Sequence, residues 1–331
     1  MGEVYNYAHI KGKCVSQDYT VIRNRIQKNL KKLKSYLTKG GIEAFRLYNK
    51  DIPEYPYLID VYGESAVIYE QGKKLSQEED ALREKHQKHI ELALSEILSI
   101  PADRQHFKIR ERQKGNDQYQ IMASDAQKYF LVHEPPMKFL VNLERYLDTG
   151  LFLDMRPLRQ YLLTNSKRKK VLNLFCYTGS LSVASAMGGG NVTSVDMSKT
   201  YLDWAHENFL RNNLDPKQHV FRQADVMKDL LQRKEAGEKF DLIILDPPSF
   251  SNSKRMEEDL DIERDHALLV RDCMQLLNAG GMLIFSTNKK KFELHPVVTS
   301  QYLVKEISQW TIPMDFHHTE IHRAWQMHVK N

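Results

Sequence analysis

Two stretches of the chain place residues that can do chemistry directly after apolar runs. Residues 171–180 read Val-Leu-Asn-Leu-Phe-Cys-Tyr-Thr-Gly-Ser, and residues 240–250 read Phe-Asp-Leu-Ile-Ile-Leu-Asp-Pro-Pro-Ser-Phe. In the first, Gly179 and Ser180 let a ligand approach the backbone, and free amides at a helix N-terminus bind polar groups. An ordinary strand-to-helix turn is the alternative for this stretch. The second ends in a motif that can hold a flat base.

Two acidic residues follow the next two predicted strands. Asp196 comes 17 residues after Gly179, close to the spacing at which an acid binds a ribose diol. Asp225 follows the third strand, where a carboxylate can reach an adenine amino group. Each could instead cap the next helix, although Ser198 could cap in place of Asp196. The order of turn, acid, acid and Asp-Pro-Pro favours a nucleoside cofactor.

The second stretch predicts a grip on a nucleic-acid base. Its prolines stiffen the backbone just past a central strand and fix the preceding carbonyls as acceptors for base N–H groups. An aromatic ring there can stack on an extruded base, worth ~1–3 kcal/mol. A proline-rich loop with a core phenylalanine is the alternative. The residues expected to meet the base are Asp246, Pro247, Pro248 and Phe250. Lys254 and Arg255 follow and can hold phosphate.

These motifs require elements that bring strand ends together. From about residue 148, strands and helices alternate strictly, which predicts a parallel sheet covered on both faces and a doubly wound, Rossmann-like α/β fold. The predicted strands are 171–175, 192–195, 219–222, 242–245 and 282–286, and the helices are 180–187, 200–212, 226–233 and 264–277. Ligands then bind at the carboxyl edge. The leading hypothesis is an S-adenosylmethionine-dependent methyltransferase of nucleic acid.

The N-terminal part follows a different pattern. Residues 18–39 predict a helix with one apolar stripe, a possible N-cap at Asp18 and a stop at residues 40–41. Alternating strands at 44–48, 57–62, 66–69, 107–110, 129–132 and 139–143, with a helix at 77–100, predict a small α+β domain. We expect a basic N-terminal segment and helix at 1–40, an RNA-binding α+β domain at 41–145 and the methyltransferase domain at 146–331.

Positive charge is concentrated near the N-terminus. The chain of 331 residues has a net charge of +5, but residues 1–45 contain nine Lys or Arg against three acids. A basic lobe on a near-neutral body suits a polyanion such as RNA. A solvated helix face is the alternative. The candidate RNA-binding residues of this helix are Lys31, Lys32 and Lys34.

The composition indicates the cellular compartment and argues against a zinc protein and a membrane protein. The three cysteines stand far apart without a CxxC pair, which predicts a reducing, cytoplasmic compartment and no zinc site. No apolar run reaches the ~18–20 residues of a membrane span, and the N-terminus has no signal-peptide core. We therefore expect no metal and no membrane partner. His317, His318, His322 and His328 lack ligand spacing and are interpreted as surface or packing residues.

The motifs resemble a known family, the bifunctional bacterial large-subunit rRNA guanine methyltransferases, in their C-terminal half. The matching stretches are 25–33, 53–55, 110–120, 146–156, 175–180, 195–202, 246–256, 264–266 and 288–289. In that family this half methylates N7 of a guanine in 23S rRNA, and the other half makes N2-methylguanine. The resemblance implies the guanine-N7 module alone, as a stand-alone protein or a fragment, with a separate N2-guanine methyltransferase as a possible partner. Naked rRNA and a precursor ribosomal particle are both open as substrate.

The resemblance also implies roles for individual residues. The methionine part of S-adenosylmethionine would be lined by Tyr177, Thr178, Gly179 and Ser180, and Phe175 would be a further cofactor-binding residue. Asp196, with Met197 beside it, would hold the ribose, and Asp225 would face the adenine. Asp246 would border both cofactor and base. Residues 148–156 would border the pocket, with Phe152 as a wall.

The chain lacks the cysteine that methylation of cytosine carbon 5 requires, and this predicts which atom receives the methyl group. More distant relatives with this fold methylate carbon 5 of cytosine, which needs a cysteine thiolate to add to the ring. Their cysteine lies in a Phe-Ser-Cys segment, whereas this chain reads Phe285-Ser-Thr287. Guanine N7 has a free lone pair and needs only alignment with the methyl group. The alternatives are an amino-group methyltransferase acting on guanine N2 or adenine N6, and a silent RNA-binding assembly factor.

Overall fold

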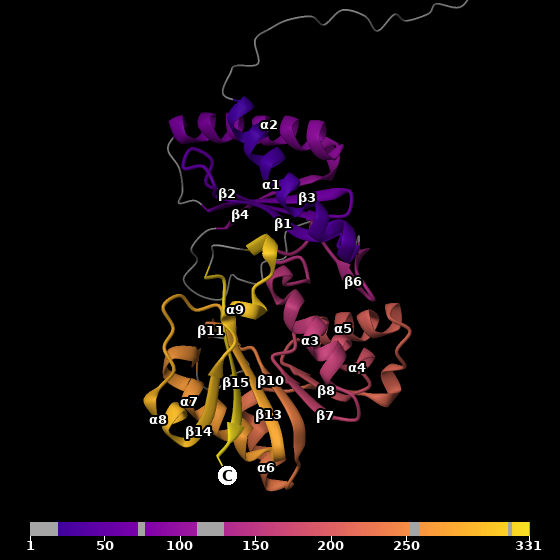
Figure 1. Cartoon of the computed structure of the whole chain (residues 1–331), viewed down its shortest axis with the longest axis vertical. Helices are drawn as coiled ribbons and strands as arrows, with labels where there is room; N and C mark the ends of the chain where they lie inside the picture. Colours follow the sequence, from indigo (N-terminus) through magenta and orange to yellow (C-terminus); the bar gives the residue numbers. More distant parts are fainter. Residues whose placement is uncertain (1–18, 72–76, 111–128, 252–258, 317–319, 331) are drawn as a thin grey trace, which may run out of the picture.

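The computed structural model describes residues 19–71, 77–110, 129–251, 259–316 and 320–330, which form two lobes joined by a small hairpin (Figure 1). The N-terminal lobe has a sheet of order β1-β2-β3-β4. Its elements are α1 (Tyr19–Gly40), β1 (Ala44–Asn49), β2 (Tyr57–Tyr62), β3 (Ser65–Gln71), α2 (Gln77–Leu98) and β4 (Gln105–Arg110). These agree with the predicted elements to within three residues. Asp18, the possible N-cap of α1, lies outside the described residues.

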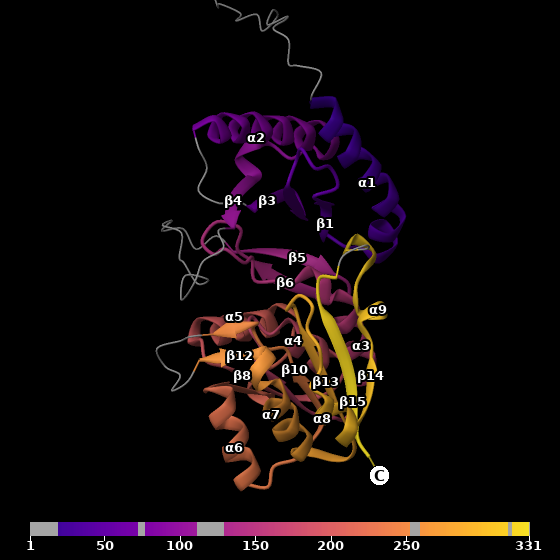
Figure 2. The same cartoon turned by 90° about the vertical axis from the view of Figure 1, so that its left-hand side faces the viewer.

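Both faces of the N-terminal sheet are covered. Alternate residues such as Phe45 and Ile59 pack under α1 and α2, which lie on the outer face (Figure 2). On α1, the contacts come from the predicted apolar stripe, in which Ile22 and Ile26 are fully buried. The intervening residues, such as Leu58 and Tyr62, face the rest of the molecule. Every residue of β2 is buried as a result.

The hairpin of β5 (Phe130–Glu134) and β6 (Met137–Val141) lies between the lobes (Figure 2). It is held to the C-terminal lobe by side chains that bond its backbone. Asn208 accepts from the Leu140 N–H at 2.9 Å, and Trp204 Nε1 donates to the Leu140 carbonyl at 3.1 Å. The amide of Asn212 bonds both backbone groups of Lys138.

The C-terminal lobe is a seven-stranded sheet of order β14-β15-β13-β10-β7-β8-β9. Its strands are β7 (Lys170–Leu174), β8 (Asn191–Asp196), β9 (Val220–Gln223), β10 (Phe240–Leu245), β13 (Leu277–Thr287), β14 (Tyr302–Glu306) and β15 (Arg323–Val329). Its helices are α3 (Arg156–Asn165), α4 (Ser180–Met187), α5 (Lys199–Arg211), α6 (Val226–Glu235), α7 (Ile262–Gln275), α8 (Pro296–Gln301) and α9 (Ser308–Thr311). Short elements complete it: η3 (Leu153–Met155), β11 (Phe250–Ser251), β12 (Leu260–Asp261) and η5 (Met314–Phe316).

This architecture confirms the predicted Rossmann-like α/β fold with one correction. Strands β9, β8, β7, β10 and β13 are parallel, but β15 pairs antiparallel with both β13 and β14. The sheet is therefore mixed rather than wholly parallel. Helices α3 to α5 pack on one face, and α6 to α8 pack on the other. The sequence-based interpretation also missed α3, α8, β14 and β15.

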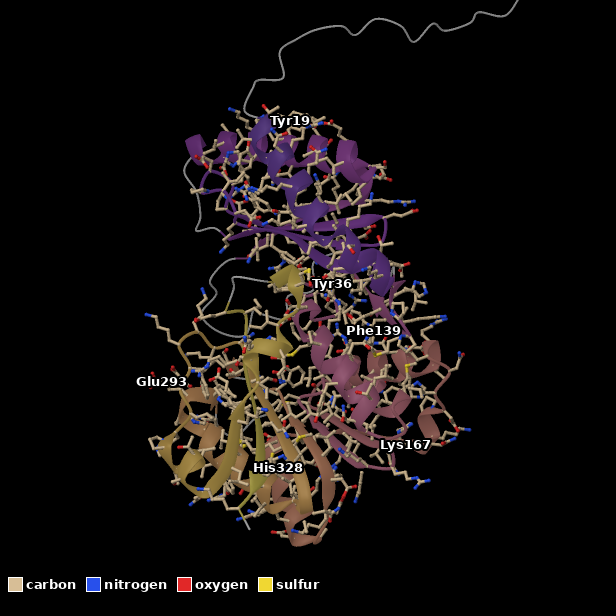
Figure 3. All side chains as sticks on the ribbon, viewed as in Figure 1. Tyr19, Tyr36, Phe139, Lys167, Glu293 and His328 are labelled. Atoms are coloured by element: carbon tan, nitrogen blue, oxygen red, sulfur yellow. The ribbon has the colours of Figure 1, made fainter. Side chains whose placement is uncertain are left out.

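A buried network of ion pairs joins the lobes through α3. Arg159 donates to both carboxylate oxygens of Glu134, at 2.8 and 2.6 Å. Arg156 pairs with Asp315 at 2.7 Å and donates to the carbonyl of Ala44 in β1. The junction lies beside Tyr36 of α1 (Figure 3), whose hydroxyl is 3.2 Å from Arg156 Nη1. Removing one partner of such a pair leaves a buried charge, at about 3–5 kcal/mol.

Candidate active site

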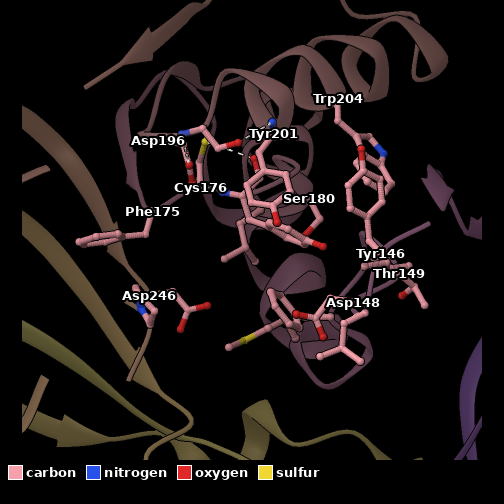
Figure 4. A pocket seen from close by; sticks show the side chains of 18 of the residues that line it. Tyr146, Asp148, Thr149, Phe175, Cys176, Ser180, Asp196, Tyr201, Trp204 and Asp246 are labelled. Carbon is pink, nitrogen blue, oxygen red and sulfur yellow. Dashed lines mark hydrogen bonds between the residues drawn. The ribbon is translucent and has the colours of Figure 1, made fainter. Parts of the chain in front are cut away.

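One cavity of about 1520 Å³ opens where the carboxyl ends of β7, β8 and β10 meet (Figure 4). Figure 4 shows Asp196 and Ser180 facing it from the strand-end loops and Asp246 across from them. Its roof comes from the N-terminal sheet, through Tyr62 and Tyr69. This is the edge at which a doubly wound sheet binds ligands.

The loop between β7 and α4 has an unusual backbone. Phe175, Tyr177 and Gly179 have φ values of 55°, 51° and 74°. The left-handed region costs an aromatic residue ~1–3 kcal/mol, and such strain gathers at functional sites. A Cβ at Gly179 would lie 2.7 Å from Cβ of Ala205, so only glycine fits there. The left-handed backbone of this loop therefore costs the fold some stability.

An aromatic cluster stands beside this loop. The ring of Tyr177 lies 5.1 Å from that of Phe152 and 4.5 Å from that of Tyr201. Phe152 keeps 40% of its surface exposed and lines the cavity. Aromatic faces of this kind attract cations as well as apolar groups.

Asp196 at the end of β8 is a buried carboxyl that accepts two backbone hydrogen bonds. Its Oδ2 accepts from the Tyr177 N–H at 2.9 Å, and its Oδ1 accepts from the Ser198 N–H at 2.8 Å. Burial raises the pKa of Asp196 to about 6, although these backbone bonds oppose the rise. Each carboxylate oxygen can accept a second hydrogen bond. Asp196 can therefore accept hydroxyl groups from the cavity.

Asp246 follows β10 and lies at the opposite wall. Ser286 of β13 donates to its Oδ1 at 2.7 Å, and burial raises the pKa of Asp246 to about 6. Pro247 and Pro248 line the cavity beside it. Ser249 donates to Asn288 at 2.6 Å, which ties the loop to the end of β13.

Comparisons with known proteins agree with this geometry. The family model of S-adenosylmethionine-dependent methyltransferases matches residues 73–320. The chain is 42% identical to the ribosomal RNA large subunit methyltransferase K of Neisseria meningitidis, over 95% of the chain and 88% of that protein. It is 44% identical to the methyltransferase K/L of Marinobacter nauticus, over 94% of the chain but only 43% of that longer protein.

The chain belongs to the S-adenosylmethionine-dependent rRNA large subunit methyltransferase K and K/L family. A methyltransferase solved with S-adenosylhomocysteine superimposes with a TM-score of 0.75 at 26% identity, covering 96% of this chain and 83% of that one. A methyltransferase from Streptococcus mutans gives a TM-score of 0.72 at 25% identity, with the same coverage. The cofactor of this methyltransferase is S-adenosylmethionine.

The structure brings most of the predicted cofactor residues to the cavity, but not all. Those that line it are Phe152, Phe175, Tyr177, Ser180, Asp196, Met197 and Asp246. Thr178 is buried, and its hydroxyl donates to the Gly150 carbonyl at 2.5 Å. Gly179 packs against α5. The carboxylate of Asp225 caps α6 by accepting from the Met227 N–H at 2.8 Å, which is the structural alternative that the sequence left open.

The predicted RNA-binding lysines of α1 do not line the cavity. Lys31, Lys32 and Lys34 are exposed on α1. Lys254 and Arg255 lie outside the described residues, as do His317 and His318. Phe250 is 44% exposed in β11 and does not line the cavity.

The sequence analysis did not single out several residues that the structure places at or next to the cavity. Asn173 lines the cavity from β7 and donates to Ser182 at 2.8 Å. Asp154 lies in the stretch expected to border the pocket but was not singled out. Of the two roles expected for His322, surface or packing, the structure shows packing, since the residue is buried against Asp154. The signal for Asp154 was its position in the motif at residues 146–156, whereas nothing local marked His322.

Neither a membrane-spanning helix nor a metal-binding cluster is found in the part of the chain that the structure describes. Among those residues, no helix is long and apolar enough to cross a membrane. In the same part of the chain, no group of three or more His, Cys, Asp or Glu side chains could hold a metal ion.

Proposed function

We propose that this methyltransferase transfers a methyl group to N7 of a guanine in 23S rRNA, either naked or within a precursor ribosomal particle. The names of its relatives specify large-subunit ribosomal RNA, and the similarity extends over more than nine tenths of the chain. The position on the base is an inference from the chemistry of the cavity.

The residues around the cavity fit the cofactor. Asp196 has spare acceptor sites for the two ribose hydroxyls, and Met197 borders them. Phe175, Tyr177 and Ser180 would surround the amino-acid end, and Phe152 would form a wall beside it. The close approach of the backbone at Gly179 keeps α4 and α5 near the ligand. When bound, the cofactor supplies an electrophilic methyl group on a sulfonium.

The base would lie at the Asp246 wall. Pro247 and Pro248 hold the loop in one shape, and the hydrogen bonds from Ser286 and Ser249 fix both of its ends. Phe250 is exposed and outside the cavity lining, so its ring would stack on a base of the RNA beside the cavity rather than on the base held at Asp246.

The observation that supports guanine N7 over cytosine carbon 5 is the placement of the two thiols that the structure describes, Cys176 and Cys273. Cys176 is the one cysteine among the described residues lining the cavity. It is buried, and burial together with the charge of Asp196 raises its pKa well above the ordinary value. Cys273 is buried inside α7 with its pKa also raised by burial. Burial disfavours, at both positions, the thiolate that cytosine carbon 5 requires, whereas guanine N7 needs no nucleophile from the protein.

RNA contacts outside the cavity would come from the exposed lysines of α1, the helix that packs on the outer face of the N-terminal sheet. Lys254 and Arg255, close in sequence to Phe250, would hold phosphate near the target base. Phosphate contacts of this kind position the RNA without reading its sequence.

The test is to incubate the protein with labelled S-adenosylmethionine and 23S rRNA, and to identify the modified nucleoside by mass spectrometry. We expect 7-methylguanosine from the wild type and a large loss with Asp246→Ala. Asp241→Ala, at the other end of β10, is the matched control. Recovery of 5-methylcytidine, N2-methylguanosine or N6-methyladenosine would contradict the assignment.

A further inference from the structure

A buried chain of three side chains ends in the cavity at Asp154. Nδ1 of His322 lies 2.7 Å from Oδ2 of Asp154, and Nε2 lies 2.9 Å from Oγ1 of Thr311. The side chain of His322 is fully buried, whereas Asp154 lines the cavity and keeps 14% of its side chain exposed. Three separate segments supply the chain: η3, α9 and the residue before β15.

The hydrogen bonds restrict where the protons of His322 lie. The Thr311 hydroxyl is 3.1 Å from the Ser308 carbonyl and 2.9 Å from Nε2, and it has one proton to donate. An ionised Asp154 can only accept, so Nδ1 must carry the proton of the 2.7 Å hydrogen bond between them. Burial acts to raise the pKa of Asp154, but the hydrogen bond and charge of His322 bring it below the ordinary value.

Asp154 lies on the base side of the cavity. His322 directly precedes β15, which pairs with β13, and Ser286 of β13 donates to Asp246. Burial is the main reason that the pKa of Asp246 is raised, and the charge of Asp154 adds to it. Asp196, the ribose candidate, lies on β8, two strands beyond β10. The cavity therefore has a carboxylate whose pKa His322 holds below the ordinary value, and it lies beside the base motif rather than beside the nucleoside end of the cofactor.

We propose that Asp154 accepts N–H groups of the target guanine and stabilises the positive charge that the base acquires, with His322 as its positioning residue. This inference rests on the proposed guanine-N7 function. It adds a specificity-determining residue that belongs to neither the Asp-Pro-Pro motif nor the nucleoside-binding acids.

The reaction explains why a carboxylate is useful there. The N7 lone pair forms the new N–C bond while the C–S bond breaks and its electrons stay on sulfur. One positive charge thus moves from sulfur to the purine ring, and no proton is transferred. Guanine offers N1–H and the N2 amino group as adjacent donors, which a carboxylate can accept together. Because the ring becomes cationic, this interaction is stronger in the transition state than in the ground state.

The experiment compares Asp154→Asn with wild type in single-turnover methylation of 23S rRNA, and measures S-adenosylhomocysteine binding by calorimetry. The variant keeps the shape of the side chain but loses its charge. We expect the methylation rate to fall on the order of 10²-fold with unchanged affinity for S-adenosylhomocysteine. Asp241→Asn is the matched control, since Asp241 accepts hydrogen bonds from Lys170 and Asn278 at the far end of β10.

His322 is tested by two variants of the same position. His322→Ala removes the donor to Asp154, whereas His322→Asn retains an N–H near the place of Nδ1. We expect the rate to fall in the first and to be largely restored in the second, with equal melting temperatures. This pair also carries the test if Asp154→Asn fails to fold. His328→Asn, on the same β15 strand and bonded to Gly281, is the control.

Two results would overturn the inference. An unchanged methylation rate in Asp154→Asn would show that the carboxylate does not act on the base. A loss of S-adenosylhomocysteine affinity that matches the loss of rate would show that Asp154 holds the cofactor's amino group instead. Failure of the proposed function is recognised separately, because the wild-type product would then not be 7-methylguanosine.

Discussion

Binding of S-adenosylhomocysteine should weaken as the pH falls below about 6, because of Asp196. Burial raises the pKa of this carboxyl to about 6 in the free protein. Ribose hydroxyls donate hydrogen bonds, and the ionised carboxylate accepts them better than the protonated acid does. Binding therefore favours the deprotonated form, and affinity rises with pH and levels off above about 7.

The expected size follows from the same pKa. At pH 5, one unit below it, roughly ten proteins in eleven carry the proton, so affinity is about tenfold below its plateau, or about 1.4 kcal/mol. Calorimetry with S-adenosylhomocysteine from pH 5 to 8 measures this slope. Asp196→Asn should bind weakly at every pH, with no slope in that range.

Asp246 provides the control, because burial raises its pKa to about 6 as well. Asp246→Asn should retain the slope if the ribose lies at Asp196. A flat profile in the wild type would refute the reasoning. So would a slope that survives in Asp196→Asn or disappears in Asp246→Asn.

Three further changes test other parts of the structure. Gly179→Ala should lower both the melting temperature and the affinity for S-adenosylhomocysteine. The left-handed backbone costs an alanine ~1–2 kcal/mol, and the new methyl group would lie 2.7 Å from Cβ of Ala205. Gly237→Ala is the control for the backbone cost alone, because Gly237 has a φ of 67° but open space around it. Glu134→Gln should reduce the free energy of unfolding by about 3–5 kcal/mol in urea titrations, because it leaves Arg159 without its counter-charge, and an unchanged midpoint would contradict the structural role. Replacing Lys31, Lys32 and Lys34 with alanine should lower the affinity for rRNA. The slope of log affinity against log salt concentration should become shallower by about 0.7–0.9 per lysine, as measured by filter binding at several salt concentrations.

Local patterns were sufficient to predict the sheet core and the edge where ligands bind. The runs before Phe175 and Asp246 are buried on both faces of a parallel sheet, so their apolar sequences are continuous and easily recognised. The turn at Gly179 was recognised from its small residues, although the structure uses this glycine for close packing on α5 rather than for lining the cavity. These features depend on residues near one another in the sequence.

The parts that were missed depend on distant contacts. Strand β14 is only five residues long and contains no buried residue, and β15 becomes a strand by pairing with β13. The role of Asp225 could not be decided, because a carboxylate after a strand can serve a cap or a ligand equally well. His322 lies 168 residues from Asp154, and only the folded chain brings their side chains together.

The roof of the cavity limits how this enzyme can be divided. Tyr62 and Tyr69 belong to the N-terminal sheet, yet they close the space in which cofactor and base would meet. A catalytic fragment that began at α3 would lack that wall and would expose Arg156 and Arg159 to solvent without Ala44 or Glu134. Grafting this catalytic lobe onto another RNA-binding module would therefore fail unless the N-terminal sheet travelled with it.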